Sequence, residues 1–167
     1  YAGQLPPQVQ APAGETPERL IMTGNQAAAL GAMTAGCRFY AGYPITPASG
    51  LMEFLAESMP KLGGKVIQTE DEISAITMTI GASFAGAKAM TATSGPGFAL
   101  MIEALGHASM TEVPIVVVDV QRAGPSTGMP TKPEQADLLQ AMFGRNGESP
   151  IPVLAPQSPA DCFDVPI

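Results

Sequence analysis

The chain alternates between short β-type segments and longer helix-type segments, and this alternation constrains its fold more than any other feature. Five segments have the length and residue types of strands, namely 38–42, 65–69, 89–93, 115–120 and 151–154. Segments with helical spacing of apolar residues precede or separate them at 25–35, 48–59, 71–85, 98–110 and 134–143. Strands joined through helices run parallel, and their crossovers are right-handed. We therefore expect an α/β fold, a doubly wound, mostly parallel sheet with helices on both faces.

The two ends of the chain differ in composition from this alternating region. Residues 1–20 contain Pro6, Pro7 and Pro12 and no periodic apolar residues, which is typical of a linker or extended arm. We assign residues 21–163 to the α/β domain. Residues 164–167 are expected to begin a further segment of a longer polypeptide, because the chain stops where a helix should develop after Ser158.

The charge balance is acidic, with 8 Lys and Arg residues against 15 Asp and Glu residues and a net charge of −7. This balance argues against a nucleic-acid-binding groove, which needs a basic surface. Two cysteines, Cys37 and Cys162, are too few to ligate zinc or an iron–sulfur cluster, so we expect no metal site in the chain. No apolar run approaches the ~18 residues of a membrane span, and no secretory signal opens the chain. We expect a cytoplasmic domain that does not enter a membrane.

The expected helices at 71–85 and 98–110 are apolar around most of their circumference. Ile73, Met78 and Phe84 lie on different faces of the first, and Leu100 and Met110 extend the apolar surface of the second. One face of a sheet covers only part of such a helix. Two interpretations remain open: these helices contact another chain or domain, or they are core helices whose small residues allow close packing.

In a doubly wound sheet, ligands bind beyond the carboxyl ends of the strands. After the first strand, Pro44 and Pro47 bracket Thr46 and stiffen the turn, which either holds that hydroxyl for a ligand or is only a rigid connection. After the second strand, acids are favoured at a helix start by the helix dipole. Glu70 falls at the junction and is expected to point into the crevice, whereas Glu72 lies in the first turn, where it could act as a capping carboxylate.

The loops after the third and fourth strands carry different signals. The turn 93–97 has small residues that let a ligand approach the backbone, but it matches no nucleotide phosphate loop. Arg122 suits a substrate carboxylate, or it pairs with a local acid such as Glu134 or Asp137. The single histidine, His107, is expected to be a packing residue, and no Ser–His–Asp set supports a hydrolase.

Taken together, the four loops are far more specific than any one of them. Their motifs are Tyr43-Pro-Ile-Thr-Pro47, Gln68-Thr-Glu70, Thr91-Ala-Thr-Ser-Gly-Pro-Gly97 and Gln121-Arg-Ala-Gly-Pro-Ser-Thr-Gly128. In this order they resemble the α subunit of 2-oxoacid:ferredoxin oxidoreductases, most closely the 2-oxoglutarate type, over about residues 24–163. The resemblance implies the pyrimidine-binding domain of thiamine diphosphate enzymes.

The resemblance also implies an activity and a set of roles. The enzymes decarboxylate a 2-oxoacid oxidatively to an acyl-CoA and pass the electrons to ferredoxin. Glu70 would activate thiamine diphosphate through its pyrimidine ring, and the interval from Glu70 to Thr93 favours it over Glu72. Thr46 and Arg122 would bind the substrate. The residues that would line the cofactor are Tyr43, Pro44, Ile45, Gly95 and Pro96.

Some motifs that such an enzyme requires are missing from this sequence. It has no Gly-Asp-Gly followed by Asn-Asn, which holds the diphosphate through Mg²⁺, and no cysteine set for a cluster. The resemblance therefore implies a hetero-oligomer in which a β subunit carries the diphosphate-binding domain, the Mg²⁺ and the iron–sulfur cluster, with ferredoxin and coenzyme A as further partners. The isolated chain should be inactive.

Three alternatives remain beside this interpretation. The same fold could act on pyruvate or on a branched-chain or aryl 2-oxoacid, or it could be a binding module without catalysis. A flavodoxin-like electron carrier is disfavoured because no Ser/Thr-rich phosphate loop follows the first strand.

Overall fold

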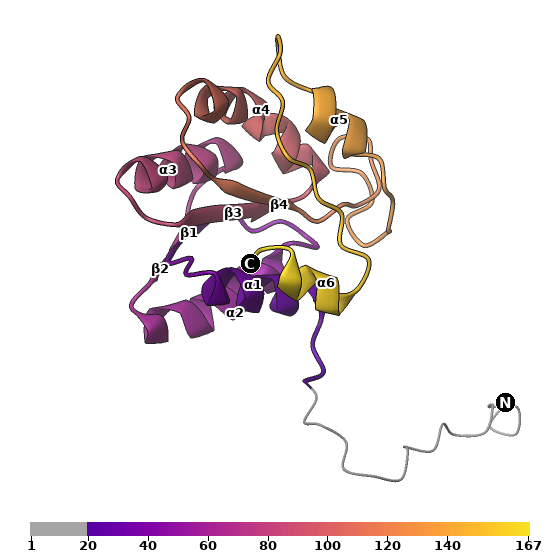
Figure 1. Ribbon diagram of the computed structural model, residues 1–167. Helices are drawn as coiled ribbons and strands as arrows, with labels where there is room; N and C mark the ends of the chain where they lie inside the picture. The colour runs from indigo at the N-terminus through magenta and orange to yellow at the C-terminus, as the bar shows by residue number, and fades with distance from the viewer. Residues whose placement is uncertain (1–19) are drawn as a thin grey trace, which may run out of the picture.

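The structure is a computed structural model and describes residues 20–167. A central sheet carries helices on both of its faces (Figure 1). The expected proline-rich arm at residues 1–20 lies, except for Leu20, outside the described residues. No helix among the residues described here is long and apolar enough to cross a membrane.

The sheet has four strands, β1 (Phe39–Gly42), β2 (Lys65–Gln68), β3 (Ala89–Thr93) and β4 (Val116–Asp119). Their order is β2-β1-β3-β4, and every neighbouring pair is parallel. The chain first places β2 on one side of β1 and then β3 and β4 on the other side. This reversal makes the sheet doubly wound, with its switch point between β1 and β3, and confirms the expected fold class.

One face of the sheet is covered by α1 (Gly24–Thr34), α2 (Ser49–Ser58) and the short 3-10 turn η2 (Met59–Leu62) (Figure 1). Helix α6 (Pro159–Asp164) lies against α1 rather than on the sheet, and it forms where a helix after Ser158 was expected. The core on this face is built from fully buried side chains of the helices and of β1, including Tyr40, Leu51, Leu55 and Met59.

The other face is covered by α3 (Glu72–Phe84) and α4 (Gly95–Met110), with the short α5 (Leu138–Phe143) beside the start of α4 (Figure 1). Ile76 and Met101 are fully buried in the core between these helices and the sheet. Phe84 and Met110 nevertheless remain 83% and 84% exposed. The expectation that the sheet leaves part of both helices uncovered is therefore confirmed.

The structure corrects three of the expected elements. The segment 151–154 is not a strand, because Pro152 has no N–H to donate to a ladder and the segment pairs with no other. The helix expected at 134–143 begins only at Leu138. Helix α4 begins at Gly95 instead of residue 98, since proline is well tolerated in the first helical turn and the turn 95–97 is already helical.

Candidate functional site

The loops that follow the four strands leave the same edge of the sheet because all the strands are parallel. Main-chain hydrogen bonds join the starts of these loops in pairs. The Thr69 N–H donates to the Gly42 carbonyl at 2.9 Å, which holds the start of the β2–α3 loop beside the end of β1. The Val120 N–H donates to the Thr93 carbonyl at 2.9 Å, which holds the start of the loop after β4 beside the end of β3. The four motifs of the sequence therefore share one edge.

Arg122 crosses this edge and contacts the loop that follows β1. Its Nη1 donates to the Thr46 carbonyl oxygen at 2.8 Å, across 76 residues of sequence, and its Nη2 donates to the Thr127 carbonyl at 2.8 Å. The residue is 7% exposed, and its buried Nε has no hydrogen-bond partner. The structure thus brings together the two residues that were expected to bind a 2-oxoacid.

The alternative partners of Arg122 do not pair with it. Glu134 accepts a hydrogen bond from the Gly124 N–H at 3.1 Å, and the Asp137 carboxylate lies against Gly95. Among residues 20–167 the structure contains one ion pair, between Lys61 and Glu57. No carboxylate of the described chain therefore neutralises the guanidinium, which leaves its charge available to an anionic ligand.

The three acids at the junction of β2 and α3 lie in different environments: one caps a helix, one is exposed and one is buried. Asp71 caps α3, since its Oδ1 accepts from the Ser74 N–H at 2.6 Å. The capping role considered for Glu72 is therefore filled by Asp71. Glu70 is exposed in this single chain, one residue beyond the anchored Thr69, whereas Glu72 is only 7% exposed.

Strand β3 and the β3–α4 turn contain further polar atoms that lack hydrogen-bond partners. Ser94 occupies the N-cap position of α4, but its side chain does not cap the helix. The buried hydroxyl oxygens of Ser94 and Thr91 have no hydrogen-bond partner. A Cβ added at Gly97 would collide with Thr93 Oγ1 and come within 2.7 Å of Glu72 Oε1. The Glu72 carboxylate therefore lies against the first turn of α4, where the helix dipole favours a negative charge.

The remaining predicted cofactor residues lie on the two loops at the switch point. Tyr43 is 39% exposed and Pro44 is exposed, while Ile45 is half-buried and packs against the core. Gly95 is buried and Pro96 half-buried in the first turn of α4. They line the two sides of the switch point, where a ligand of this fold binds.

A pair of carboxylates at this edge was not identified from the sequence. Asp119 ends β4 and Asp137 precedes α5, and burial, followed by the neighbouring Asp137, raises the pKa of Asp119 to about 7. Asp137 had been considered only as a partner for Arg122. No signal for the pair was available from the sequence, because Asp137 fell inside the helix expected at 134–143 and only the structure shows that this helix begins at Leu138.

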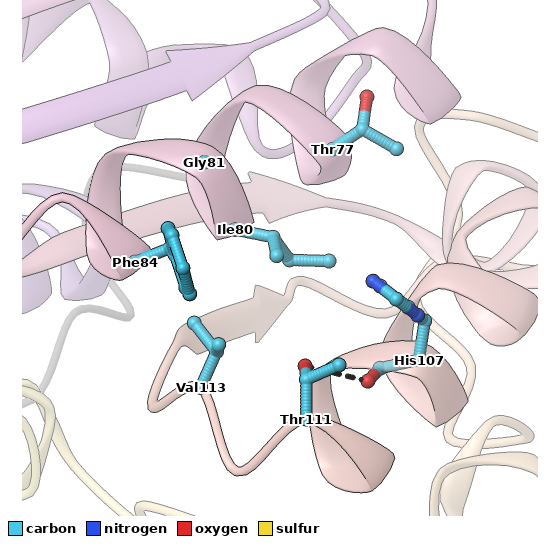
Figure 2. A pocket seen from close by; sticks show the side chains of 7 residues that line it. All are labelled: Thr77, Ile80, Gly81, Phe84, His107, Thr111 and Val113. Atoms are coloured by element: carbon cyan, nitrogen blue, oxygen red, sulfur yellow. Dashed lines mark hydrogen bonds between the residues drawn. The ribbon is translucent and has the colours of Figure 1, made fainter.

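His107 does not have the packing role expected for it. It is exposed and lies in the last turn of α4. There it lines a groove of about 340 Å³ between α3 and α4, with Ile80 and Phe84 on the opposite side (Figure 2). Cys37 and Cys162 are both free thiols. In the part of the chain that the structure describes, no three His, Cys, Asp or Glu side chains come together as metal ligands.

Comparison with known proteins identifies the family. Residues 30–167 match the family described as pyruvate flavodoxin/ferredoxin oxidoreductase, thiamine diphosphate-binding. The chain belongs to this family. It is 57% identical over 146 residues to the 2-oxoglutarate synthase subunit KorA of Archaeoglobus fulgidus, covering 87% of this chain and 42% of that protein. It is 49% identical over 166 residues to the 2-oxoglutarate oxidoreductase subunit KorA of Mycobacterium tuberculosis, covering 96% of this chain and 25% of that protein.

A solved structure of the family has the same fold. The 2-oxoglutarate:ferredoxin oxidoreductase from Magnetococcus marinus, with 2-oxoglutarate, coenzyme A and succinyl-CoA bound, matches with a TM-score of 0.87 and 52% identity. The match covers 88% of this chain and 26% of that chain. The resemblance to α subunits of 2-oxoacid:ferredoxin oxidoreductases is therefore confirmed. The chain spans less than half the length of these relatives.

Proposed function

We propose that this chain supplies the pyrimidine-binding side of a thiamine diphosphate-dependent 2-oxoglutarate:ferredoxin oxidoreductase. The reaction is oxidative decarboxylation of the 2-oxoacid to an acyl-CoA, with the electrons passed to ferredoxin. One observation carries the proposal: an un-neutralised, buried Arg122 reaches across the carboxyl edge to Thr46, at the switch point of the sheet. Membership of the thiamine diphosphate-binding family and the 2-oxoglutarate bound to the Magnetococcus relative support the cofactor and the substrate.

The residues at the switch point fit the aminopyrimidine of thiamine diphosphate. The Ser94 hydroxyl is buried without a partner, and two glycines, Gly95 and Gly97, leave little side-chain bulk in the first turn of α4. Tyr43, Pro44 and Ile45 would hold the ring from the β1–α2 side, and Gly95 and Pro96 from the α4 side. Thiamine diphosphate supplies the nucleophilic carbon and the electron sink that decarboxylation of a 2-oxoacid requires.

The β2–α3 junction offers two carboxylates for activation of the pyrimidine. We assign this role to Glu70, whose position at the end of β2 and spacing from the β3–α4 turn match the family pattern. Glu72 is its rival, because Glu72 is the buried carboxylate and its Oε1 lies beside Gly97. Whichever acid serves, its carboxyl group would hold a proton against a ring nitrogen, and burial in the assembled site would strengthen that hydrogen bond.

Arg122 and Thr46 would bind the carboxylate and keto group of the substrate. The fixed guanidinium attracts an anion, and the unpaired Nε offers a donor beyond the two that bind main-chain carbonyls. Because every 2-oxoacid has this carboxylate, pyruvate and branched-chain or aryl 2-oxoacids remain the alternative substrates. The distal carboxylate of 2-oxoglutarate would be selected by other residues of the assembled enzyme.

A β subunit would complete the site from the other side of the cofactor. We propose that it carries the diphosphate-binding domain, the Mg²⁺ and the iron–sulfur cluster, since no metal-binding cluster is found among residues 20–167. The relatives from Aeropyrum pernix and Sulfurisphaera tokodaii are likewise described as subunit alpha. The exposed apolar surface of α3 and α4, including the groove in Figure 2, would contact this subunit.

The test replaces Arg122 in the assembled enzyme. With coenzyme A and ferredoxin supplied, Arg122→Met should raise the KM for 2-oxoglutarate on the order of 100-fold, because a buried charge pair with the substrate is lost. Binding of thiamine diphosphate should be unchanged. Lys132→Met removes an exposed cation from the same loop and is the matched control.

The outcomes separate the candidate functions. A wild-type enzyme that oxidises pyruvate or a branched-chain or aryl 2-oxoacid faster than 2-oxoglutarate would change the substrate and leave the enzyme class intact. A wild-type complex that binds thiamine diphosphate but turns over none of these acids would make the domain a binding module. An unchanged KM in Arg122→Met would contradict the substrate-binding role.

A further inference from the structure

Asp119 and Asp137 enclose the loop that carries Arg122. Asp119 ends β4 three residues before Arg122, and Asp137 closes the same loop just before α5. The parallel register places Asp119 beside Thr93, at the carboxyl end of β3. The two acids therefore occupy the base of the loop, on the edge of the sheet where Arg122 crosses to Thr46.

Asp137 does not act as a helix cap, although it occupies the N-cap position of α5 and its side chain could cap that helix. Its carboxylate instead lies against the first residue of α4, where a Cβ added at Gly95 would be 2.9 Å from both carboxylate oxygens. Its main-chain N–H donates to Gln121 Oε1 at 3.0 Å, which ties the two ends of the loop together. The Asp137 side chain therefore makes no capping hydrogen bond to α5. It lies instead beside Asp119 and the start of α4.

The two carboxyl groups cannot both be ionised at this position without strong repulsion. Asp119 Oδ1 and Asp137 Oδ2 are inaccessible to solvent and accept no hydrogen bond from any described donor. Two facing carboxylates in such a position are stable when one of them is protonated and donates to the other. Burial, with Asp137 as the next cause, raises the pKa of Asp119 to about 7, in agreement with a retained proton.

The other charged groups nearby are directed elsewhere. The Arg122 guanidinium donates to the Thr46 and Thr127 carbonyls, and Glu134 accepts from the Gly124 N–H. Glu72, at the start of α3, lies against Gly97 rather than Gly95. The β3–α4 turn itself contributes no titratable side chain. The charge state of the pair is therefore set by Asp119 and Asp137 themselves.

We propose that Asp119 and Asp137 share one proton and thereby fasten the 120–137 loop, so that they act as positioning residues for Arg122. This inference rests on the proposed role of Arg122 in binding the 2-oxoacid. When the shared proton is lost, the two negative charges repel each other and the base of the loop opens. Arg122 then loses its fixed place beside Thr46, and the affinity for the substrate falls while the chemical step is affected less.

The direction of the pH effect follows from the raised pKa of Asp119. Between the ordinary pKa of an aspartate and about 7, the folded loop binds a proton that the unfolded chain does not bind. The stabilisation by this proton is complete below the ordinary pKa, is lost as the pH rises to about 7, and changes no further above that value. The loop should accordingly be looser at pH 8.5 than at pH 6.

The experiment combines substrate kinetics with hydrogen exchange in the assembled enzyme between pH 6 and 8.5. In the wild type, the KM for 2-oxoglutarate should rise several-fold across this range, and the amides of residues 120–137 should lose protection after correction for intrinsic exchange rates. In Asp119→Asn, whose amide imitates the protonated acid, both changes should disappear. In Asp119→Ala, which leaves Asp137 without a partner, the KM should be about tenfold higher at every pH.

The control is Glu53→Gln, which removes one exposed negative charge from α2 and should keep the wild-type pH profile. If loop protection has the same pH dependence in the wild type and in Asp119→Asn, the proton-sharing pair is refuted. If loop protection follows the prediction but the KM does not, the pair fastens the loop and the proposed substrate role of Arg122 is the part that fails.

Discussion

Single residues at the carboxyl edge combine burial with incomplete hydrogen bonding. Arg122 leaves its Nε unpaired, and the hydroxyls of Thr91 and Ser94, at the end of β3 and in the turn that follows, are buried without a hydrogen-bond partner. Leaving a buried polar group unsatisfied costs about 1–3 kcal/mol. Several such groups at one edge are typical of a site whose ligand supplies the missing hydrogen bonds.

The two candidate acids can be separated by neutral variants of the same shape. In the assembled enzyme, Glu70→Gln should lower turnover about 10²- to 10⁴-fold, because an amide cannot hold the proton that activates the pyrimidine. Glu72→Gln should fold normally and keep most of the turnover. The measurement is kcat with 2-oxoglutarate, with circular dichroism as the folding check. The reverse pattern, a large loss only in Glu72→Gln, would transfer the role to the buried acid.

At the scale of elements, α4 determines much of the site through its first turn. This turn contacts Asp137 through Gly95 and Glu72 through Gly97, and both approaches need residues without a side chain. Farther along, α4 and α3 expose Leu100, Met110 and Phe84. The same helix therefore has a close-packed first turn at the candidate site and an exposed apolar surface farther along.

Two glycines of α4 offer a matched test of this packing. Gly97→Ala places a methyl group against Thr93 and Glu72, so it should destabilise the chain by about 1–3 kcal/mol. Gly106→Ala meets no atom within 4 Å and should stabilise the helix by about 0.5–1 kcal/mol. Urea denaturation of both variants measures the difference. Equal free energies of unfolding would show that the turn is not closely packed.

The apolar surface of α3 and α4 can be tested by co-purification with the β subunit. Phe84→Asp introduces a charge at a side chain that is 83% exposed in the single chain, and it should abolish assembly because a buried unpaired charge is costly. Phe143→Asp is the control, since Phe143 is 70% exposed on α5, outside the α3–α4 face. A complex that survives Phe84→Asp and is lost in Phe143→Asp would place the interface on α5.

At the scale of the whole molecule, the proposed function gives the chain one half of a site. The pyrimidine side would be formed by loops from all four strands, whereas residues 1–167 contain no Gly-Asp-Gly followed by Asn-Asn. A cofactor held between two subunits gains most of its contacts only after assembly. The acidic chain, with a net charge of −7, would also repel the diphosphate unless a cation on the partner offsets it.

Calorimetric titration tests this division. The isolated chain should show no measurable binding of thiamine diphosphate, and the assembled complex should bind it only when Mg²⁺ is present, because the proposed metal would offset the charge of the diphosphate on the partner. Tight binding by the isolated chain without Mg²⁺ would contradict the shared site. The complex treated with a chelator serves as the control.

The sequence by itself determined the layered architecture and the edge that holds the site, because the spacing of apolar residues and the turn residues act locally. It could not determine the contacts between distant segments. The hydrogen bond from Arg122 to Thr46 spans 76 residues, and the facing of Asp119 and Asp137 depends on how a loop closes against α4. The burial of Glu72 was likewise decided by packing against Gly97, which no local pattern records. Spacing predicts which face of an element is apolar, whereas the packing of whole elements decides which polar groups meet.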